Sequence, residues 1–265
     1  MGSATREALA KSVSALAAQG TKADLATAED LFAAGRVVAD SAQLRAVVSD
    51  PSADPKGKAA LVASVFGRQL SAPAVELLSA IAAERWSKPR DLLAAIEELG
   101  IRAIAQSAPK NVDIASELFT FGGAVTSNAD LELALRSKLA DPAAKGALVD
   151  RLLNGRASAQ TAAIVRQLVV QPRGRSIRES LREAARVVAA QSDLVVATVF
   201  TAQALPAAQA ERLGEALSTK YGTQLKINQV VDPSLLGGVR VQIGDDVIDG
   251  SIASRINELR LQLAG

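Results

Sequence analysis

The chain has 265 residues, of which 49% are hydrophobic, and its formal net charge of +2 comes from 30 basic and 28 acidic side chains. This length allows two or three domains with a buried core, and the charge balance lacks the concentrated basic excess typical of nucleic-acid-binding proteins. The chain contains no cysteine and no histidine, which excludes disulfides, thiolate or histidine metal sites and histidine-based catalytic triads. No apolar run reaches the about 18 residues that a membrane-spanning helix needs. Aromatic residues make up only 3% of the chain, so alanine, leucine and valine must pack what we expect to be helical bundles.

The first 20 residues predict an amphipathic helix and not a secretory signal. Charged residues at Arg6, Glu7 and Lys11 interrupt any continuous apolar block. One face of the expected helix is apolar or small, through Ala8, Leu9, Ser12, Val13 and Leu16.

The first two thirds of the chain contain an internal duplication. Residues 31–78 align without gaps onto residues 118–165, at a constant offset of 87 positions. Both copies carry an Asp-Pro pair before an apolar helix, at Asp54 and at Asp141. Asp is a good N-cap and Pro suits the first helical position, so the same element starts at the same place in each copy. Two amphipathic stretches of similarly biased composition are the alternative, which the shared cap disfavours.

Each copy predicts the same series of helices. In the first copy we expect a helix over 24–48, a short helix after Asp54, a longer helix after Ser71 that stops near Ser87, and a last helix after Lys88. In the second copy the equivalent positions are 112–139, Asp141, Ser158, Pro172 and Ser176. The helix from Pro89 to Ser107 either closes the first bundle or is shared by both. An offset of 87 residues is far longer than a solenoid unit, so we expect two small bundles, over 1–108 and 109–190.

The sequence changes character from Asp193. The segment from Leu194 to Thr201 is β-branched and alternating, which indicates a strand. The expected elements that follow are a helix over 206–221, strands over 224–231, 239–243 and 247–248, and a helix from Ser251 to Leu263. The predicted fold class is therefore α+β and mainly α: two tandem all-α bundles followed by a small mixed α/β domain over 191–265.

Two polar features near the end of the chain could carry chemistry. Asp245, Asp246 and Asp249 could hold Mg²⁺ on oxygen ligands and support a phosphoryl-transfer enzyme, but a hairpin turn requires the same residue types, and no phosphate-binding loop accompanies them. Gly237 and Gly238 precede a strand and not a helix, so a bulge or close backbone approach is favoured over phosphate binding.

A run of arginines precedes the C-terminal domain. It consists of Arg166, Arg173, Arg175, Arg178, Arg182 and Arg186. An RNA-binding helical regulatory protein is one interpretation. Interleaved acidic residues at helical pairing distance, such as Glu179 with Arg175, and the lack of stacking aromatics favour a solvated helix face or a protein contact.

The last expected helix has an apolar stripe with the spacing that helix-in-groove recognition uses. The stripe consists of Ile252, Ile256, Leu259 and Leu263, with Arg255 beside it. Core packing is the favoured role, and a partner contact is the alternative.

The segment from Val230 to Glu258 combines strands, an Asp-Pro turn and glycine-rich turns in under thirty residues. As a set, these motifs resemble the delta subunit of bacterial F-type ATP synthases, called OSCP in mitochondria. The resemblance is carried by Asp232, Pro233, Gly237, Gly238, Gly244, Asp249, Gly250 and Ser251, to which we assign structural roles. It also includes the small-residue segment 201–206, the Tyr221-Gly222 break and the helix–turn–helix around Arg85, Trp86 and Ser87.

The resemblance implies a non-catalytic peripheral-stalk (stator) subunit that needs no cofactor and no metal and that binds no nucleic acid. Its helical bundle would contact N-terminal segments of the alpha subunits, and its C-terminal domain would bind the end of the b subunits. One copy per complex would resist rotation of the catalytic head during proton-driven ATP synthesis. The subunit would be peripheral, on the cytoplasmic face of the cell membrane, and would reach the membrane only through the complex.

The duplication is a departure from the family's usual single bundle. The copy at 111–190 occupies the place of that bundle, just before the C-terminal domain. Longer, duplicated forms resemble those of actinobacteria, where a related version is fused to a membrane-anchored stator helix. This chain resembles the stand-alone form. The duplication leaves open which bundle contacts the alpha subunits.

Overall fold

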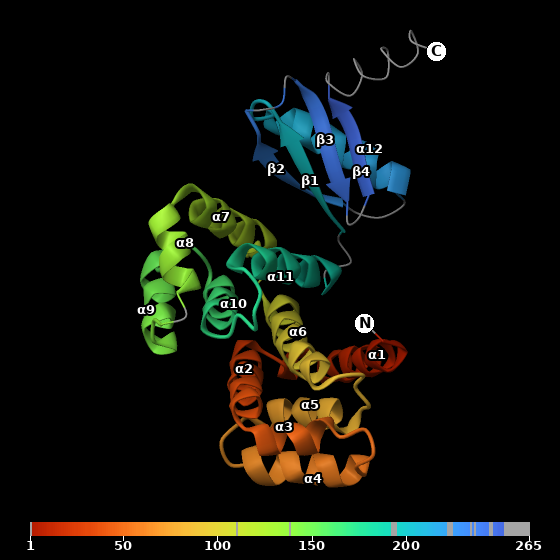
Figure 1. The fold of residues 1–265 in the computed structure, drawn as a ribbon. Helices are drawn as coiled ribbons and strands as arrows, with labels where there is room; N and C mark the ends of the chain where they lie inside the picture. Colours follow the sequence, from red (N-terminus) through yellow and green to blue (C-terminus); the bar gives the residue numbers. More distant parts are fainter. Residues whose placement is uncertain are drawn as a thin grey trace, which may run out of the picture. The chain divides into compact units, whose positions relative to one another are not determined.

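The computed structural model describes residues 2–109, 111–137, 139–191, 195–221, 225–233, 235, 237–243 and 246–251. The chain divides into two compact units, Met1–Val188 and Ala189–Gly265 (Figure 1). The first unit is helical and the second contains a small sheet, which confirms the predicted fold class. The boundaries expected at 1–108, 109–190 and 191–265 remain a prediction.

The first copy of the duplication contains six α-helices and one short 3-10 helix. They are α1 (Ser3–Gln19), η1 (Gly20–Lys22), α2 (Leu25–Asp40), α3 (Ala42–Ser49), α4 (Pro55–Phe66), α5 (Ala72–Ala83) and α6 (Pro89–Ser107). Helix α1 buries Ala8, Ser12 and Leu16, as its amphipathic pattern predicts.

The second copy repeats the part of this series from α2 to α6. Its helices are α7 (Ile114–Ser127), α8 (Ala129–Arg136), α9 (Pro142–Leu153), α10 (Ala159–Val170) and α11 (Ile177–Gln191). Helices α3, α4 and α5 return as α8, α9 and α10 with the same lengths and the offset of 87 residues. The predicted duplication is therefore confirmed in the structure.

The prediction of one long helix over 24–48, and over its counterpart in the second copy, was wrong. Ser41 and Asn128 have extended backbones, and each accepts a hydrogen bond from the backbone N–H three residues later, at 3.2 and 3.0 Å. Each side chain thus caps a new helix, so α2 and α3 are separate, as are α7 and α8. Helix α5 is also shorter than predicted, because it ends at Ala83.

A long-range hydrogen bond recurs in the two copies. Asp30 on α2 accepts a hydrogen bond from the backbone N–H of Ser71 at 2.8 Å, and Glu117 on α7 accepts one from Ser158 at 3.0 Å. In both cases a carboxylate accepts from a backbone N–H at the N-terminus of a helix, α5 or α10, where negative charge is favoured. The copies therefore share a tertiary contact as well as helix boundaries.

One continuous core runs through both copies. It extends from Ala8 in α1 to Val188 in α11. The largest fully buried side chains are Phe66, Leu16, Leu31, Leu77, Ile81, Leu92, Ile96, Leu99, Ile104, Leu118, Ile164 and Leu168. Alanines and leucines dominate this core, in line with the composition.

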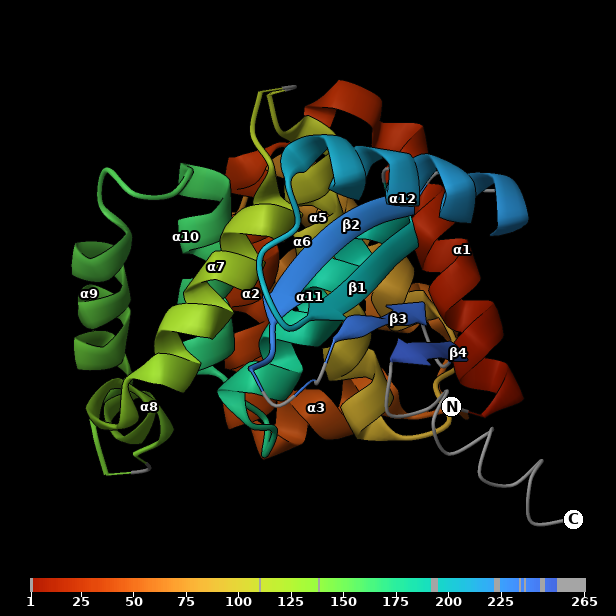
Figure 2. The same ribbon diagram turned by 90° about the horizontal axis from the view of Figure 1, so that it is seen from above.

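The C-terminal unit contains a four-stranded sheet with the order β2-β1-β3-β4. Its elements are β1 (Val195–Thr201), α12 (Ala207–Tyr221), β2 (Leu225–Val231), β3 (Gly238–Ile243) and β4 (Asp246–Ser251). Strands β1 and β2 are parallel and joined through α12, and the other two pairings are antiparallel. Helix α12 covers one face of the sheet (Figure 2), where Leu217 packs with Val199 and Val241. The predicted order of elements is confirmed up to Ser251, and the expected last helix lies outside the described residues.

Candidate functional site

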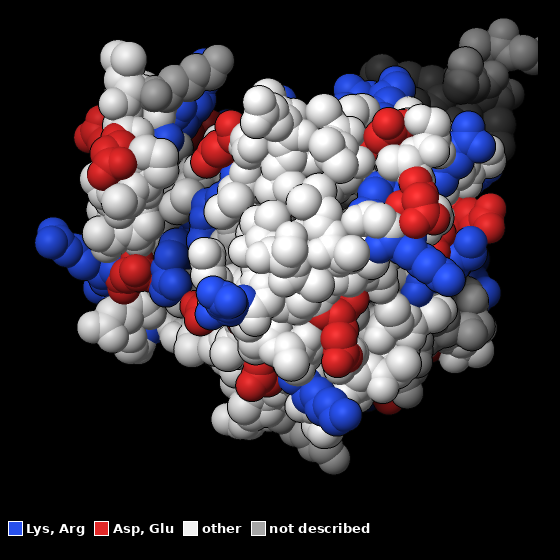
Figure 3. All heavy atoms as spheres, turned by 90° about the horizontal axis from the view of Figure 1, so that it is seen from below, with Lys and Arg blue, Asp and Glu red and all other residues white. Residues whose placement is uncertain are grey.

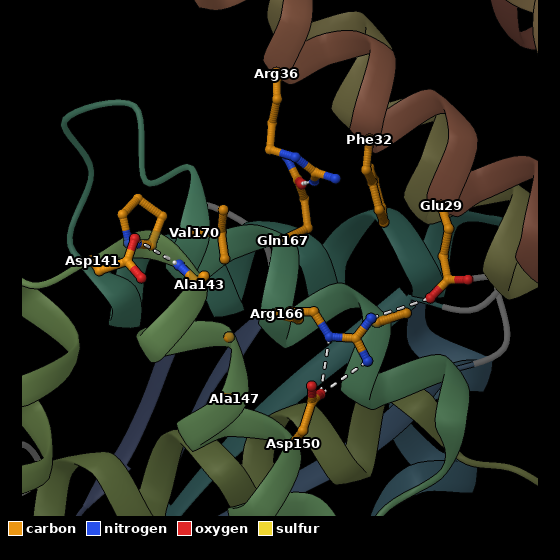
Figure 4. A pocket seen from close by; sticks show the side chains of 13 residues that line it. Glu29, Phe32, Arg36, Asp141, Ala143, Ala147, Asp150, Arg166, Gln167 and Val170 are labelled. Atoms are coloured by element: carbon orange, nitrogen blue, oxygen red, sulfur yellow. Dashed lines mark hydrogen bonds and ion pairs between the residues drawn. The ribbon is translucent and has the colours of Figure 1, made fainter. Parts of the chain in front are cut away.

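The junction between the two copies is hollowed between α2 and the pair α9–α10. The hollow has a volume of about 780 Å³ and a partly apolar lining that includes Phe32 and Val170. Figure 4 shows Glu29, Phe32 and Arg36 of α2 facing Arg166 and Gln167 of α10. Helices from both copies thus build one concave surface.

Arg166 bridges the two sides of this hollow. Its guanidinium lies 2.9 Å from an oxygen of Asp150 on α9 and 3.3 Å from an oxygen of Glu29 on α2. All three side chains are more than 40% exposed, and exposed ion pairs contribute only about 0–1 kcal/mol each. These exposed pairs therefore link the two copies but add little to the stability of the fold.

Arg36 makes the other contact across the junction. It donates a hydrogen bond of 2.6 Å to the side-chain oxygen of Gln167, which is itself buried. Burial lowers the pKa of the Arg36 guanidinium, and the nearby Arg166 lowers it further. The half-buried cation and its neutral acceptor tie α2 to α10.

A buried carboxylate makes a stronger link between the copies. Oε1 of Glu97 on α6 accepts hydrogen bonds from Arg173 at 2.5 Å and from Arg175 at 2.7 Å, both in the turn before α11. The Glu97 side chain is 7% exposed and the arginines 18% and 22%. Burial lowers the pKa of Arg173 and Glu97 opposes that shift. The turn before α11 has an uncommon backbone: Arg173 has a positive φ of 50°, and Gly174 follows with a φ of 79°. The two hydrogen bonds to Glu97 hold this turn in place.

These contacts answer the question about the helix from Pro89 to Ser107. Gly100 on α6 packs directly against the ring of Phe32 in the first copy, while Glu97 binds the turn of the second copy. Helix α6 is therefore shared by both copies. The sequence analysis did not single out Glu97 and Gln167, which link the two copies. The available signal was a single carboxylate inside the apolar stripe of α6.

The family-signature residues lie in the C-terminal unit. The backbone N–H of Asp232 donates to Thr201 at 2.8 Å, and Pro233 is in a turn. Gly237 and Gly238 have φ values of 127° and 84°, a region that glycine tolerates best. These positions therefore shape the backbone entering β3, which supports the structural interpretation over phosphate binding.

The remaining signature and contact candidates are only partly visible. Asp249, Gly250 and Ser251 form the end of β4, and a Cβ built on Gly250 would lie 3.1 Å from the carbonyl oxygen of Val239. The remaining candidates lie outside the described residues: Gly244, Asp245, Ile252, Arg255, Ile256, Leu259 and Leu263. Within the described part of the chain, no cluster of acidic side chains could hold a metal ion.

Most arginines of the run form ion pairs within the chain. Besides the pairs above, Arg178 binds Glu132 at 2.9 Å and Arg186 binds Glu183 at 2.6 Å. The expected pair of Arg175 with Glu179 was wrong, because Arg175 precedes the start of α11 and turns to Glu97. Figure 3 shows basic and acidic side chains mixed on the face in view, without a continuous basic band. The run therefore serves contacts within the protein, which disfavours RNA binding.

Comparison with known proteins decides the family. The family model for the ATP synthase delta (OSCP) subunit matches residues 101–263. A protein named ATP synthase subunit delta from Leifsonia xyli subsp. xyli is 73% identical over 265 residues, covering all of both chains. The chain belongs to the delta (OSCP) subunit family of ATP synthases.

Relatives in Streptomyces match over nearly the whole chain as well. The ATP synthase subunit delta of Streptomyces avermitilis is 43% identical over 98% of both chains, and that of Streptomyces griseus is 39% identical over all of both chains. The family model begins within α6, so it covers the second copy and the C-terminal unit, while these relatives also extend across the first copy.

Membership defines the class of protein. A delta (OSCP) subunit is a component of the peripheral stalk of ATP synthase and is structural, not catalytic. Among the described helices, none is both long and apolar enough to cross a bilayer.

Proposed function

We propose that this chain is the connector between the catalytic head and the peripheral stalk of its ATP synthase. In this role its helical unit binds N-terminal segments of the alpha subunits, and its C-terminal unit binds the b subunits. One molecule of this chain in each complex holds the catalytic head against the torque of the central shaft. The family membership supports this assignment, and the same membership supports a peripheral position on the cytoplasmic face of the cell membrane.

The observation that carries the proposal is the construction of the helical unit. A connector under torsional load needs stiff elements and stable contacts, which typically bury about 1,200–2,000 Å² each. Here two helical copies share α6 and a single core, and Glu97 ties the two together through buried charged hydrogen bonds. Bundles 1–108 and 109–190 would then transmit force as one body.

The C-terminal contact is assigned to the stripe Ile252, Ile256, Leu259 and Leu263, whose spacing suits a helix–helix interface. This assignment is tested with the full chain and purified alpha and b subunits. We expect Ile256→Asp to weaken capture of b while capture of alpha is unchanged. Val247→Asp is a control on an exposed residue of the same unit, because Val247 is 57% exposed.

Two results would count against the proposal. If the folded chain captures neither alpha nor b at low salt, the connector role is wrong. If Ile256→Asp unfolds the C-terminal unit, as judged by circular dichroism, then Ile256 belongs to the core and the stripe is not the contact.

A further inference from the structure

Two buried charged atoms at the contact between α6 and the turn before α11 have no hydrogen-bond partner in the protein. They are the Oε2 oxygen of Glu97 and the Nε nitrogen of Arg173. Among the side chains that the structure describes, the other buried polar atoms without a partner are the hydroxyl oxygens of Ser71 and Ser180. Burying an unpaired polar atom costs more free energy when the atom belongs to an ionised group, so Glu97 and Arg173 need a further partner most.

The two unpartnered atoms lie beside the same short contact. The Nη2 nitrogen of Arg173 donates a hydrogen bond of 2.5 Å to the Oε1 oxygen of Glu97. Nε is joined to Nη2 through one carbon atom, and Oε2 is joined to Oε1 through one carbon atom. A buried donor and a buried acceptor are therefore close neighbours at this contact.

The arrangement of the arginines explains why these two atoms are left over. Arg175 also donates to Oε1 of Glu97, at 2.7 Å, so both guanidinium groups use the same oxygen. Arg173 extends from a turn in which its own φ is 50° and that of Gly174 is 79°. From this turn it meets the carboxylate through Nη2 alone, and not through the two parallel hydrogen bonds that arginine and carboxylate frequently form.

Leaving both atoms unpaired would destabilise the joint. A buried polar atom without a partner costs about 1–3 kcal/mol, and more when it carries charge. The side chains of Glu97 and Arg173 are only 7% and 18% exposed, and the two atoms themselves are buried. Proteins satisfy such groups with an ordered internal water that makes two to four hydrogen bonds.

The charges at the contact select a neutral ligand. A bound cation would lie beside the guanidinium groups of Arg173 and Arg175, and a bound anion would lie beside the free oxygen of Glu97. Like charges at such short range repel each other strongly where solvent screens little. A water molecule can accept a hydrogen bond from Nε–H and donate one to Oε2, so it matches both atoms.

We propose that Glu97 and Arg173 bind one ordered water molecule, which accepts a hydrogen bond from Nε of Arg173 and donates one to Oε2 of Glu97. This water is part of the joint between the two copies, because it completes the hydrogen bonding of the buried carboxylate that ties α6 to the turn before α11. With the water in place, the guanidinium of Arg173 is held at Nε as well as at Nη2.

A crystal structure of the full chain, at a resolution that shows ordered waters, tests this proposal directly. We expect a water within about 3.2 Å of both Nε of Arg173 and Oε2 of Glu97. A direct hydrogen bond between these two atoms, or electron density without a water at this position, would overturn the proposal.

NMR of the full chain tests the same contact in solution, through the Nε–H protons of its arginines. Arg173 should show a nuclear Overhauser effect to water with the sign of a long-lived bound molecule. Arg102 on α6 is the matched control, because its side chain is 15% exposed and its Nε donates directly to Glu98 at 3.0 Å. It should show no such effect.

The Arg173 signal is assigned by through-bond correlation to its backbone. Arg173→Lys keeps the charge but removes Nε–H, so this signal and its effect to water should both disappear in that variant. No effect to water at Arg173, or an equal effect at Arg102, would contradict the proposed water site.

Discussion

Replacing Glu97 with glutamine should destabilise the helical unit far more than the loss of an exposed ion pair would. Glu97 is 7% exposed and its oxygen accepts hydrogen bonds from Arg173 and Arg175, which are themselves mostly buried. Removing one partner of a buried pair costs about 3–5 kcal/mol, because it leaves the other charge uncompensated. Glutamine keeps the volume and one neutral acceptor, so we expect a loss of about 2–3 kcal/mol.

The chain contains a built-in probe for this measurement. Trp86 is the single tryptophan, it is 3% exposed, and it lies in the first copy, so urea unfolding can be followed by its fluorescence. Glu183→Gln is the control. This substitution removes the ion pair between Glu183 and Arg186, whose side chains are 45% and 63% exposed, respectively. It should lower the free energy of unfolding by less than about 1 kcal/mol. Equal losses in the two variants would refute the idea that Glu97 locks the copies together.

The remaining predictions concern backbone and titration. Gly100→Ala should destabilise the helical unit by about 1 kcal/mol, because the added methyl group would collide with the ring of Phe32 and this cost exceeds the gain in helix propensity. Gly123→Ala has open space around it and should stabilise the helical unit by about 0.5–1 kcal/mol. Urea titrations measure both changes. Gly237→Ala should speed amide exchange in β3, since a φ of 127° strains any other residue; unchanged exchange would contradict this. The hydrogen bond from the backbone of Thr27 lowers the pKa of Asp24 below its ordinary 3.8, so its stabilisation is present above that pH and is lost as the pH falls through the folded-state pKa. Asp24→Asn should therefore show a smaller fall in stability between about pH 5 and pH 2 than the unaltered chain.

Local signals in the sequence predicted most of the helix starts and the order of elements along the chain in the C-terminal unit. The Asp-Pro pairs at Asp54 and Asp141 fixed the starts of α4 and α9, and β-branched alternation located β1. The break between α2 and α3 was missed because a single Ser41 within a helical pattern has no strong signal. Its role as a cap depends on an extended backbone that tertiary packing selects.

The junction between the copies could not be predicted because its contacts are remote in sequence. Arg173 and Arg175 are 76 and 78 residues from Glu97, whereas spacing rules detect partners three or four residues away. For the same reason Arg175 was assigned to Glu179, the nearest acid at helical distance. The duplication itself was visible, but the sharing of α6 required the positions of Gly100 and Glu97 in space.

The most direct test of the connector role is proton-driven ATP synthesis in membrane vesicles. Vesicles whose synthase lacks this subunit should make little ATP, and adding back the full chain should restore synthesis in proportion to the amount bound, up to one copy per complex. Full synthesis without the chain, or no recovery despite saturated binding, would contradict the account.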